Sequence, residues 1–224
     1  MSGPDFLALL ARLAWKREGR SHKARFEDDY VYKFQPSTLE VMKGTPPKLT
    51  IHQSPASLGT TVWDSSIVLG KYFEKQAVFP PKYFQSKSVI ELGCGCGLTG
   101  LILHCLDTID VVRRNVKDNS TAPESDIQVF VQSWGEELPT NEKFDVIVGT
   151  DIMYIPEAIP ALITSLEQLA TPNADIYFAY GRNRNGEDEF KKGIAGTFTL
   201  EEVKREDLDE LYQSDEITQQ LQHK

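Results

Sequence analysis

The sequence holds few cysteines, and they lie close together. All three, Cys94, Cys96 and Cys105, fall within one short region of the 224 residues, whereas a small secreted fold is stapled by cysteines spread along the chain. We therefore expect reduced thiols in a loop and a helix. No second pair of cysteines and no nearby pair of histidines completes a set of four ligands, so the sequence predicts no metal site.

Long apolar runs and an excess of basic residues are also missing. No apolar run approaches the roughly 20 residues that span a bilayer, and the first residues lack the compact apolar core of a secretory signal. Asp and Glu (33) outnumber Lys and Arg (24), for a formal net charge of -9, while nucleic-acid affinity rests largely on basic surface. We expect a monomer of the cytoplasm or nucleus, with neither a membrane nor a nucleic acid as partner.

Histidine is scarce too, and the common hydrolase motifs are absent. The sequence contains no G-x-S-x-G and no H-E-x-x-H, so nothing indicates a serine hydrolase or a zinc protease. The four histidines are scattered along the chain: His22, His52, His104 and His223.

Strand-like and helix-like segments alternate along the chain, which is typical of an α/β, Rossmann-like doubly wound fold with a mostly parallel sheet. We expect residues 1–57 to form an extension, with a helix from Asp5 to Arg20 and a small hairpin, and residues 58–224 to form the main domain. In that domain, Asp64 or a nearby Thr is expected to cap a helix, and Pro156 to Ala170 and Gly186 to Lys192 are expected to be helical. The expected strands are Tyr30 to Phe34 and Lys48 to Gln53 in the hairpin, then Val89 to Leu92, Ile127 to Val131, Phe144 to Asp151, Asp175 to Tyr180, Phe198 to Lys204 and Ile217 to Leu221.

The stretch from Ser88 to Gly100 is an apolar run that ends in glycines and passes into a helix-like segment. Glycines lack Cβ, so such a turn brings bare backbone against a ligand at the carboxyl edge of a sheet. The spacing is Gly93-x-Gly95-x-Gly97, and no Lys-Ser or Lys-Thr pair follows, which argues against a P-loop for a triphosphate. The stretch therefore predicts a site for a nucleotide-like ligand.

The form Glu-Leu-Gly-x-Gly-x-Gly, which begins at Glu91, resembles motif I of class I, seven-strand methyltransferases. Three more blocks occur in an order that resembles the non-SET, methyltransferase-like protein-lysine methyltransferases, with a match from about Leu58 to Arg184. The resemblance implies S-adenosylmethionine as cofactor and a protein substrate that presents a lysine. The three blocks are Gly59 to Asp64, Ser133 to Gly135, and Asp151 to Tyr154, which has the family's Asp-x-x-Tyr form.

Two tryptophans stand at the ends of expected elements. Trp63 and Trp134 are large flat groups that could cover a purine or a thioether, although either could instead be a buried core residue. The resemblance implies a full set of cofactor-binding residues in the part of the chain that it covers: Trp63, Glu91, Gly93, Gly95, Gly97, Trp134 and Thr150.

Asp151 and Tyr154 are the candidate catalytic residues. Asp151 lies where a strand delivers residues into the ligand crevice, so its carboxylate can face an ammonium group, although it could simply cap a helix. The ring of Tyr154 could pack against the methylenes of a lysine and favour its cation. A sulfonium already activates its methyl group, so the amine need only arrive deprotonated and in line, and no catalytic triad is expected.

One segment departs from the family. Its members continue from motif I through a full helix into a second strand that ends in an acidic residue on the ribose, but here Asp107 to Asp110 follows at once after Leu106. About nine residues cannot supply a crossover helix and a returning strand. Either the second strand is missing, or Leu101 to Cys105 becomes that strand. Asp107 is the candidate ribose carboxylate, with Asp110 as the alternative.

The function expected on these grounds is S-adenosylmethionine-dependent methylation of a protein lysine. Two alternatives remain: a shortened, weak or inactive relative that acts as a binding module, and a methyltransferase for a small molecule. The Asp151 to Tyr154 block is not of the Asn/Asp-Pro-Pro-Tyr type used in base methylation, so a nucleic-acid substrate is disfavoured.

Overall fold

The computed structural model describes residues 14–41, 47–55, 58–106, 131–136, 141–181, 184–213 and 216–224. Its strands in these ranges are β1 (Tyr30–Lys33), β2 (Lys48–Ile51), β3 (Val89–Leu92), β4 (Phe144–Thr150), β5 (Ala170–Gly181), β6 (Phe198–Glu202) and β7 (Glu216–His223). Its α-helices there are α2 (His22–Phe26), α3 (Pro36–Val41), α4 (Asp64–Phe73), α5 (Leu98–Cys105), α7 (Ile159–Leu169) and α8 (Glu187–Ile194). Short 3-10 turns are η1 (Arg17–Gly19), η2 (Leu58–Thr60), η4 (Pro156–Ala158) and η5 (Arg205–Asp207).

The main sheet has the strand order β3-β4-β5-β7-β6. β3, β4 and β5 pair in parallel, whereas β7 is antiparallel to both β5 and β6, so β7 runs against the other strands. Val146, Ile147 and Val148 in β4 have no exposed surface, because helices cover both faces, and this explains the unbroken apolar run in the sequence. The predicted mostly parallel α/β fold is confirmed.

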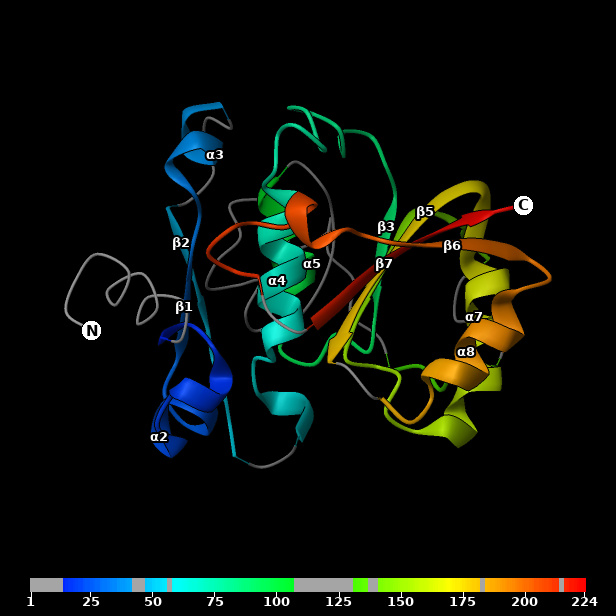
Figure 1. Cartoon of the computed structure of the whole chain (residues 1–224), viewed down its shortest axis with the longest axis horizontal. Coiled ribbons are helices and arrows are strands. Elements are labelled where there is room, and N and C mark those ends of the chain that lie inside the picture. The colour runs from blue at the N-terminus through cyan, green and yellow to red at the C-terminus, as the bar shows by residue number, and fades with distance from the viewer. Residues whose placement is uncertain are drawn as a thin grey trace.

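The molecule is layered (Figure 1). α4 and α5 cover one face of the sheet, α7 and α8 cover the other, and the β1–β2 pair lies outside α4 and α5. Each face has its own hydrophobic cluster. The cluster under α4 and α5 also contains Tyr32 and Leu49 of the hairpin, so residues on both sides of the predicted boundary at position 58 share one core.

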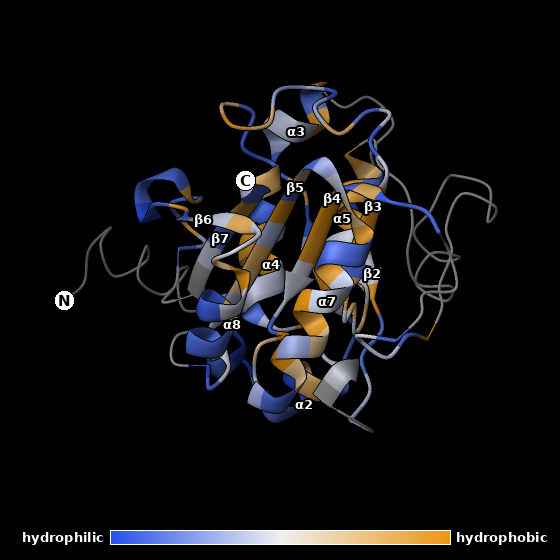
Figure 2. Ribbon diagram, turned by 90° about the vertical axis from the view of Figure 1, so that its right-hand side faces the viewer, coloured by the Kyte–Doolittle hydropathy of each residue, from blue (hydrophilic) through white to orange (hydrophobic). Residues whose placement is uncertain are grey.

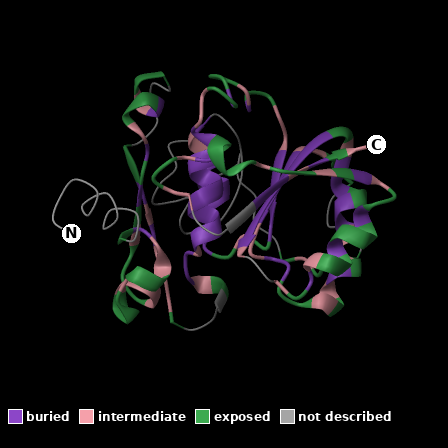
Figure 3. Cartoon of the chain, in the orientation of Figure 1, coloured by how far each residue is buried: buried purple, intermediate pink, exposed green. Residues whose placement is uncertain are grey.

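Burial along the helices follows this layering. Every residue of α4 is buried, because the hairpin covers one side of the helix and the sheet the other (Figure 3). α7 is amphipathic (Figure 2): Ile159, Leu162, Leu166 and Leu169 are buried against the sheet, whereas its exposed residues include Thr164, Glu167 and Gln168. None of the helices in the described ranges is long and apolar enough to span a membrane.

A buried carboxylate ties the N-terminal segment to α4. Glu74 accepts hydrogen bonds from Tyr32 Oη at 2.6 Å, from the Gln35 backbone N–H at 2.7 Å and from Thr38 Oγ1 at 2.8 Å. Lys71 Nζ lies 2.7 Å from the same carboxylate, and both side chains are almost fully buried. Because removing one partner of such a network leaves a buried group unpaired, these contacts hold β1 and α3 on α4.

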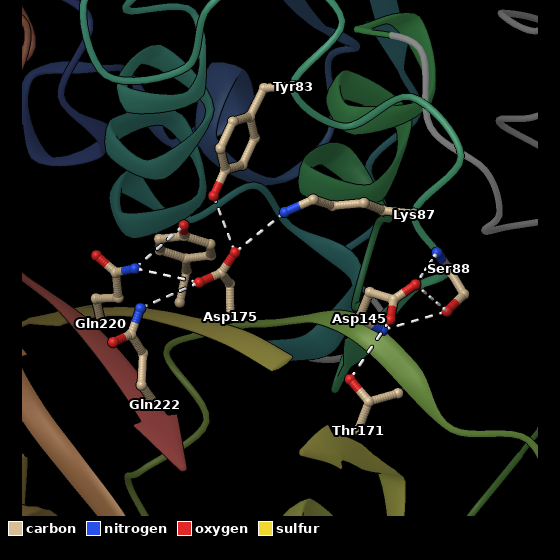
Figure 4. A network of polar contacts seen from close by, with 9 residues as sticks. Tyr83, Lys87, Ser88, Asp145, Thr171, Asp175, Gln220 and Gln222 are labelled. Carbon is tan, nitrogen blue, oxygen red and sulfur yellow. Dashed lines mark hydrogen bonds and ion pairs between the residues drawn. The ribbon is translucent and has the colours of Figure 1, made fainter. Parts of the chain in front are cut away.

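A second polar network lies at the amino edge of the main sheet, where β4 begins (Figure 4). Asp175 Oδ2 accepts from Tyr83 Oη at 2.9 Å and from Lys87 Nζ at 3.2 Å. Its Oδ1 accepts from the side-chain amides of Gln220 and Gln222, each at 3.4 Å. Both oxygens therefore have two donors, which fills the acceptor capacity of a carboxylate.

Several expected elements are confirmed in the described ranges. β1 and β2 pair antiparallel as the predicted hairpin, although α3 lies in the connection between them. β3, β4, β5, β6, β7, α7 and α8 stand where strands and helices were expected, with shifts at their ends.

Three local expectations are wrong. The helix predicted from Asp5 to Arg20 does not include residues 16–20, because Lys16 and Arg20 are extended and flank η1. Asp64 does not cap α4: Trp63 holds the N-cap position without a side-chain bond, and Asp64 Oδ1 instead accepts from the Arg17 backbone N–H at 2.7 Å. Leu101 to Cys105 is not a strand but belongs to α5, whose apolar residues bury Leu101, Ile102 and Leu103.

Other expectations fall outside the described residues. These are the first part of the N-terminal helix, the strand from Ile127 as far as residue 130, and the segment that contains Asp107 and Asp110. The alternative that the second strand is missing concerns the same segment and stays a prediction.

Candidate active site

The glycine loop joins the carboxyl end of β3 to the start of α5. Gly93, Gly95 and Gly97 have φ angles of 62°, 51° and 76°, a left-handed conformation that side chains with a Cβ rarely adopt. A Cβ on Gly93 would lie 2.6 Å from Ile152 Cγ2, and one on Gly95 would lie 2.9 Å from the Gly59 carbonyl oxygen. The glycines are thus required by the close packing of this loop as well as by its turn.

Glu91 lies in β3 directly beneath this loop. Its Oε2 accepts a hydrogen bond at 2.8 Å from the backbone N–H of Gly100, in the first turns of α5. Burial raises the pKa of Glu91 to about 7, and the bond from Gly100 opposes that shift. Among the described residues Glu91 has no cationic partner, so a positively charged ligand in the pocket would favour its ionised form.

β4 delivers the next group of side chains to the same edge. Asp151 follows the strand in a left-handed conformation with φ 53°, and its N–H donates to the Ala179 carbonyl oxygen at 2.9 Å. Asp151 Oδ1 accepts from Arg184 Nε at 2.9 Å and from Gly181 N–H at 3.2 Å, and Arg184 Nη2 also contacts it. Its Oδ2 accepts from Ser65 Oγ at 2.7 Å. The carboxylate predicted to face an ammonium group is therefore already paired with an arginine.

The two tryptophans stand on different walls of the site. A Cβ on Gly93 would lie 3.5 Å from Trp134 Cζ2, and Trp134 is partly buried against the cluster under α7. The Gly135 N–H donates to Ser165 Oγ at 2.9 Å and so fixes the Trp134 turn on α7. Trp63 precedes α4 at the opposite wall.

An arginine from the N-terminal segment supports Trp63. The Arg17 guanidinium carbon lies 4.2 Å from the Trp63 ring centroid and 4.5 Å from that of Phe26, so the cation is held between two aromatic faces. Arg20 lies 3.5 Å from Asp64 and donates to the Val62 carbonyl oxygen at 3.4 Å. Burial lowers the pKa of Arg17, and its neighbour Arg25 lowers it further.

These elements enclose a pocket of about 270 Å³ at the carboxyl ends of β3 and β4, the edge at which parallel α/β sheets bind ligands. Tyr154 stands at its rim with 54% of its surface exposed. Gly97 caps α5 and shapes the turn without lining the pocket. The predicted site residues that do line the pocket are Trp63, Glu91, Gly93, Gly95, Trp134, Thr150, Asp151 and Tyr154.

Sequence reasoning missed several side chains of this site. Arg184 lines the pocket from the loop after β5, and a basic residue just beyond a strand's carboxyl end could have suggested it. Ser65 and Arg17 carried no comparable signal, because their partners Asp151 and Trp63 are far away in the sequence.

The cysteines of the glycine loop are protonated thiols at neutral pH. Burial raises the pKa of Cys94 to about 12 and that of Cys96 to about 11, and the carboxylate of Glu91 adds to both shifts. A thiol with so high a pKa is a poor nucleophile. Searched over its described ranges, the chain shows no group of three or more metal-ligating side chains.

The fold and the pocket together define the class I methyltransferase arrangement: a Rossmann-like sheet with a glycine loop after one strand and an acidic residue after its neighbour. The chain belongs to the lysine methyltransferase family, whose model matches residues 43–197. This confirms the predicted family and the predicted class of enzyme, a lysine methyltransferase.

Individual relatives agree with this assignment. The chain is 30% identical over 183 residues to EEF1A lysine methyltransferase 3 of Xenopus tropicalis, and the match covers 75% of this chain and 78% of the relative. It is 28% identical over 157 residues to the protein N-lysine methyltransferase METTL21A of the same species, and this match covers 65% of this chain and 71% of the relative.

A solved structure matches the fold at low sequence identity. The T. Thermophilus 16S rRNA N2 G1207 methyltransferase RsmC, in complex with AdoMet and guanosine, aligns with a TM-score of 0.59 and 15% identity. The match covers 88% of this chain and 50% of that one. At this identity the likeness shows the fold alone.

Proposed function

We propose that this chain transfers the methyl group of S-adenosylmethionine to a lysine side chain of a protein. The observation that carries the proposal is that the segment from Asp151 to Tyr154 opens into the same pocket as the glycine loop. A donor held by the loop and an acceptor held at Asp151 would then meet in one enclosed space. The two Xenopus relatives, both named as lysine methyltransferases, support this choice of substrate.

The residues of the pocket fit the cofactor. Gly93 and Gly95 leave bare backbone at the wall, Glu91 offers a carboxylate without a cationic partner in the described ranges, and Trp63 and Trp134 offer flat apolar faces. Thr150 completes the wall at the end of β4. When bound, the cofactor would supply a methyl group activated by its sulfonium, and its sulfur would leave as the neutral thioether.

The chain's own task is to bind and orient the amine. Asp151 Oδ2 accepts one hydrogen bond from Ser65 Oγ and can accept another from an amine N–H. The half-exposed ring of Tyr154 can lie along the methylenes of the lysine at the rim. Such positioning lowers the barrier because it replaces a bimolecular encounter by an aligned approach of the nitrogen lone pair to the methyl carbon.

The proposal is tested with methyl-labelled cofactor and a cell protein extract. The purified chain should label proteins in the extract, and acid hydrolysis should release the label as methyl-lysine. An extract acetylated beforehand is the control, because acetylated lysines have no nucleophilic amine. Label found only in small molecules would overturn the protein substrate, and cofactor binding by calorimetry without transfer to any acceptor would indicate a binding module.

A further inference from the structure

The carboxylate of Asp151 is held unusually firmly for a residue at a pocket wall. Its Oδ1 has three donors, Arg184 Nε, Arg184 Nη2 and Gly181 N–H. Its side chain is 9% exposed and that of Arg184 is 31% exposed. Both arginine N–H groups contact the same carboxylate oxygen, and such charge-assisted bonds hold the two side chains together.

The two oxygens of Asp151 are not equally occupied. A carboxylate accepts roughly four hydrogen bonds, two on each oxygen. Oδ1 is therefore full, whereas Oδ2 has only Ser65 Oγ as donor among the described residues. One acceptor position is left on Oδ2 of a side chain that lines the pocket.

The pairing also decides which form of a lysine amine this position favours. Arg184 is the cation within ion-pair distance of Asp151 in the described part of the chain, so together they carry no net charge. A neutral pair attracts an ammonium group far less than a bare carboxylate does, but its free oxygen still accepts an N–H from a neutral amine. The neutral amine is the form whose lone pair can attack a methyl group.

Arg17 also interacts electrostatically with Asp151, but among the described residues Arg184 is the cation that lies within ion-pair distance of it. The Arg17 guanidinium lies between Phe26 and Trp63, and its backbone N–H bonds to Asp64. The carboxylate of Glu91 is bonded to α5. Besides Asp151, the ionisable side chains of the described residues that line the pocket or pack at its walls are Arg17, Arg20, Asp64, Glu91, Cys94, Cys96, Tyr154 and Arg184.

We propose that Arg184 is a positioning residue that locks Asp151 Oδ1 and cancels the charge of Asp151, so that Oδ2 receives the substrate lysine as a neutral amine. This inference rests on the proposed function. It implies that Arg184 acts through Asp151 on the protonation of the acceptor and not by contact with the methyl donor.

The test is the pH dependence of kcat at saturating substrate in Arg184→Met and Arg184→Lys. In Arg184→Met the charge of the Asp151 carboxylate is not compensated, so it favours the ammonium form of the substrate lysine. The rising limb of the kcat–pH profile should then move to higher pH by about one unit. On that limb the shift lowers kcat about tenfold at a fixed pH. Arg184→Lys keeps the charge and should return the rising limb toward its wild-type position.

Two control variants separate charge from structure. Ser65→Ala removes a donor from Asp151 without changing any charge, so it should lower kcat without moving the limb. Lys87→Met breaks the corresponding charge pair at the other edge of the sheet and should leave the limb in place. A limb that stays fixed in Arg184→Met, or equal behaviour of the Met and Lys variants, would overturn the inference.

A binding measurement keeps the test independent of turnover. Butylamine, an analogue of the lysine side chain, is titrated into the chain with the demethylated cofactor bound. Wild-type affinity should rise with pH, and at pH 7 Arg184→Met should bind butylamine more tightly than wild type because it accepts the ammonium form. Tighter binding of butylamine by wild type at pH 7 would overturn the inference. Absence of methyl transfer by the wild-type chain would instead overturn the proposed function alone, so the two failures can be told apart.

Discussion

The two edges of the main sheet each present an aspartate paired with a cation, and they differ in one respect. At the amino edge, Asp175 is paired with Lys87, and both of its oxygens have two donors (Figure 4). At the carboxyl edge, Asp151 lines the pocket and is paired with Arg184, and its Oδ2 has a single donor among the described residues. The carboxylate of Asp175 has all its donors within the protein and joins neighbouring elements. The carboxylate of Asp151 is also firmly held but keeps one acceptor position that a ligand can fill.

The largest difference between the two edges is expected when the charge of each aspartate is removed. Asp151→Asn should lower the kcat of the folded protein for the protein substrate by about 100-fold or more, and it also loses the stability of the ion pair with Arg184. Asp175→Asn should lower the free energy of unfolding by about 2 kcal/mol, because it weakens hydrogen bonds to a charged group, and should leave the kcat of the folded protein unchanged. Steady-state kinetics and thermal unfolding of both variants check this, and reversed phenotypes would show that the edges are misassigned.

Glu91 provides a contrast to both aspartates, because it is a buried carboxylate without a cationic partner in the described ranges. Burial raises its pKa from 4.5 to about 7, so the folded state prefers the protonated form. The stability that this preference contributes is complete below pH 4.5 and is lost as the pH rises to about 7. At about 1.4 kcal/mol per pKa unit, Glu91→Gln should gain up to roughly 3 kcal/mol relative to wild type between pH 4.5 and pH 7.5.

Chemical denaturation at several pH values measures that difference, with the exposed Glu201→Gln as control. A constant difference between Glu91→Gln and wild type across this range would contradict the assigned burial. Since the cofactor is a cation, its affinity should also rise with pH in wild type and not in Glu91→Gln.

The glycine loop offers the next test of the carboxyl edge. Gly95→Ala places a Cβ in a left-handed conformation and 2.9 Å from a backbone oxygen. The backbone strain alone is about 1–2 kcal/mol, so we expect cofactor affinity to fall about tenfold. Gly196→Ala is the matched control, since nothing lies within 4 Å of its Cβ. Calorimetric titration of both variants would refute the loop assignment if their affinities were equal.

The smallest expected effect concerns the N-terminal segment. Arg17→Met removes the cation that lies against Trp63, a contact of about 1 kcal/mol, so cofactor affinity should fall roughly fivefold. Lys23→Met, an exposed position on α2 paired with Asp28, should leave affinity unchanged. If both variants bind the cofactor like wild type, the segment does not support the Trp63 wall.

The parts of the fold that rest on local patterns could be predicted from the sequence. The unbroken apolar run of β4 and the spacing of Leu162, Leu166 and Leu169 in α7 each point to one element. The glycine loop and the residues after β4 were predicted as parts of one site because parallel strands bring their carboxyl ends to the same edge.

The remaining features depend on contacts between distant residues. Asp64 stands at the first turn of α4, where a cap is expected, but its carboxylate bonds to Arg17, 47 positions away. Asp151 was expected to offer a free charge, and only the folded chain brings Arg184 and Ser65 to it. No period or spacing in the sequence encodes such pairs. The sequence could therefore place the ends of β3 and β4 at one edge, but it could not predict that Asp151 is paired with Arg184.

The central claim is that the pocket at the carboxyl edge transfers a methyl group to a protein lysine through Asp151. The most direct test is mass spectrometry of proteins incubated with the chain and S-adenosylmethionine, run in parallel with Asp151→Asn and Asp175→Asn. We predict methyl-lysine in samples with wild type and with folded Asp175→Asn, and almost none with Asp151→Asn. Equal methylation by Asp151→Asn, or no methyl-lysine from a wild-type chain that binds the cofactor, would contradict the claim.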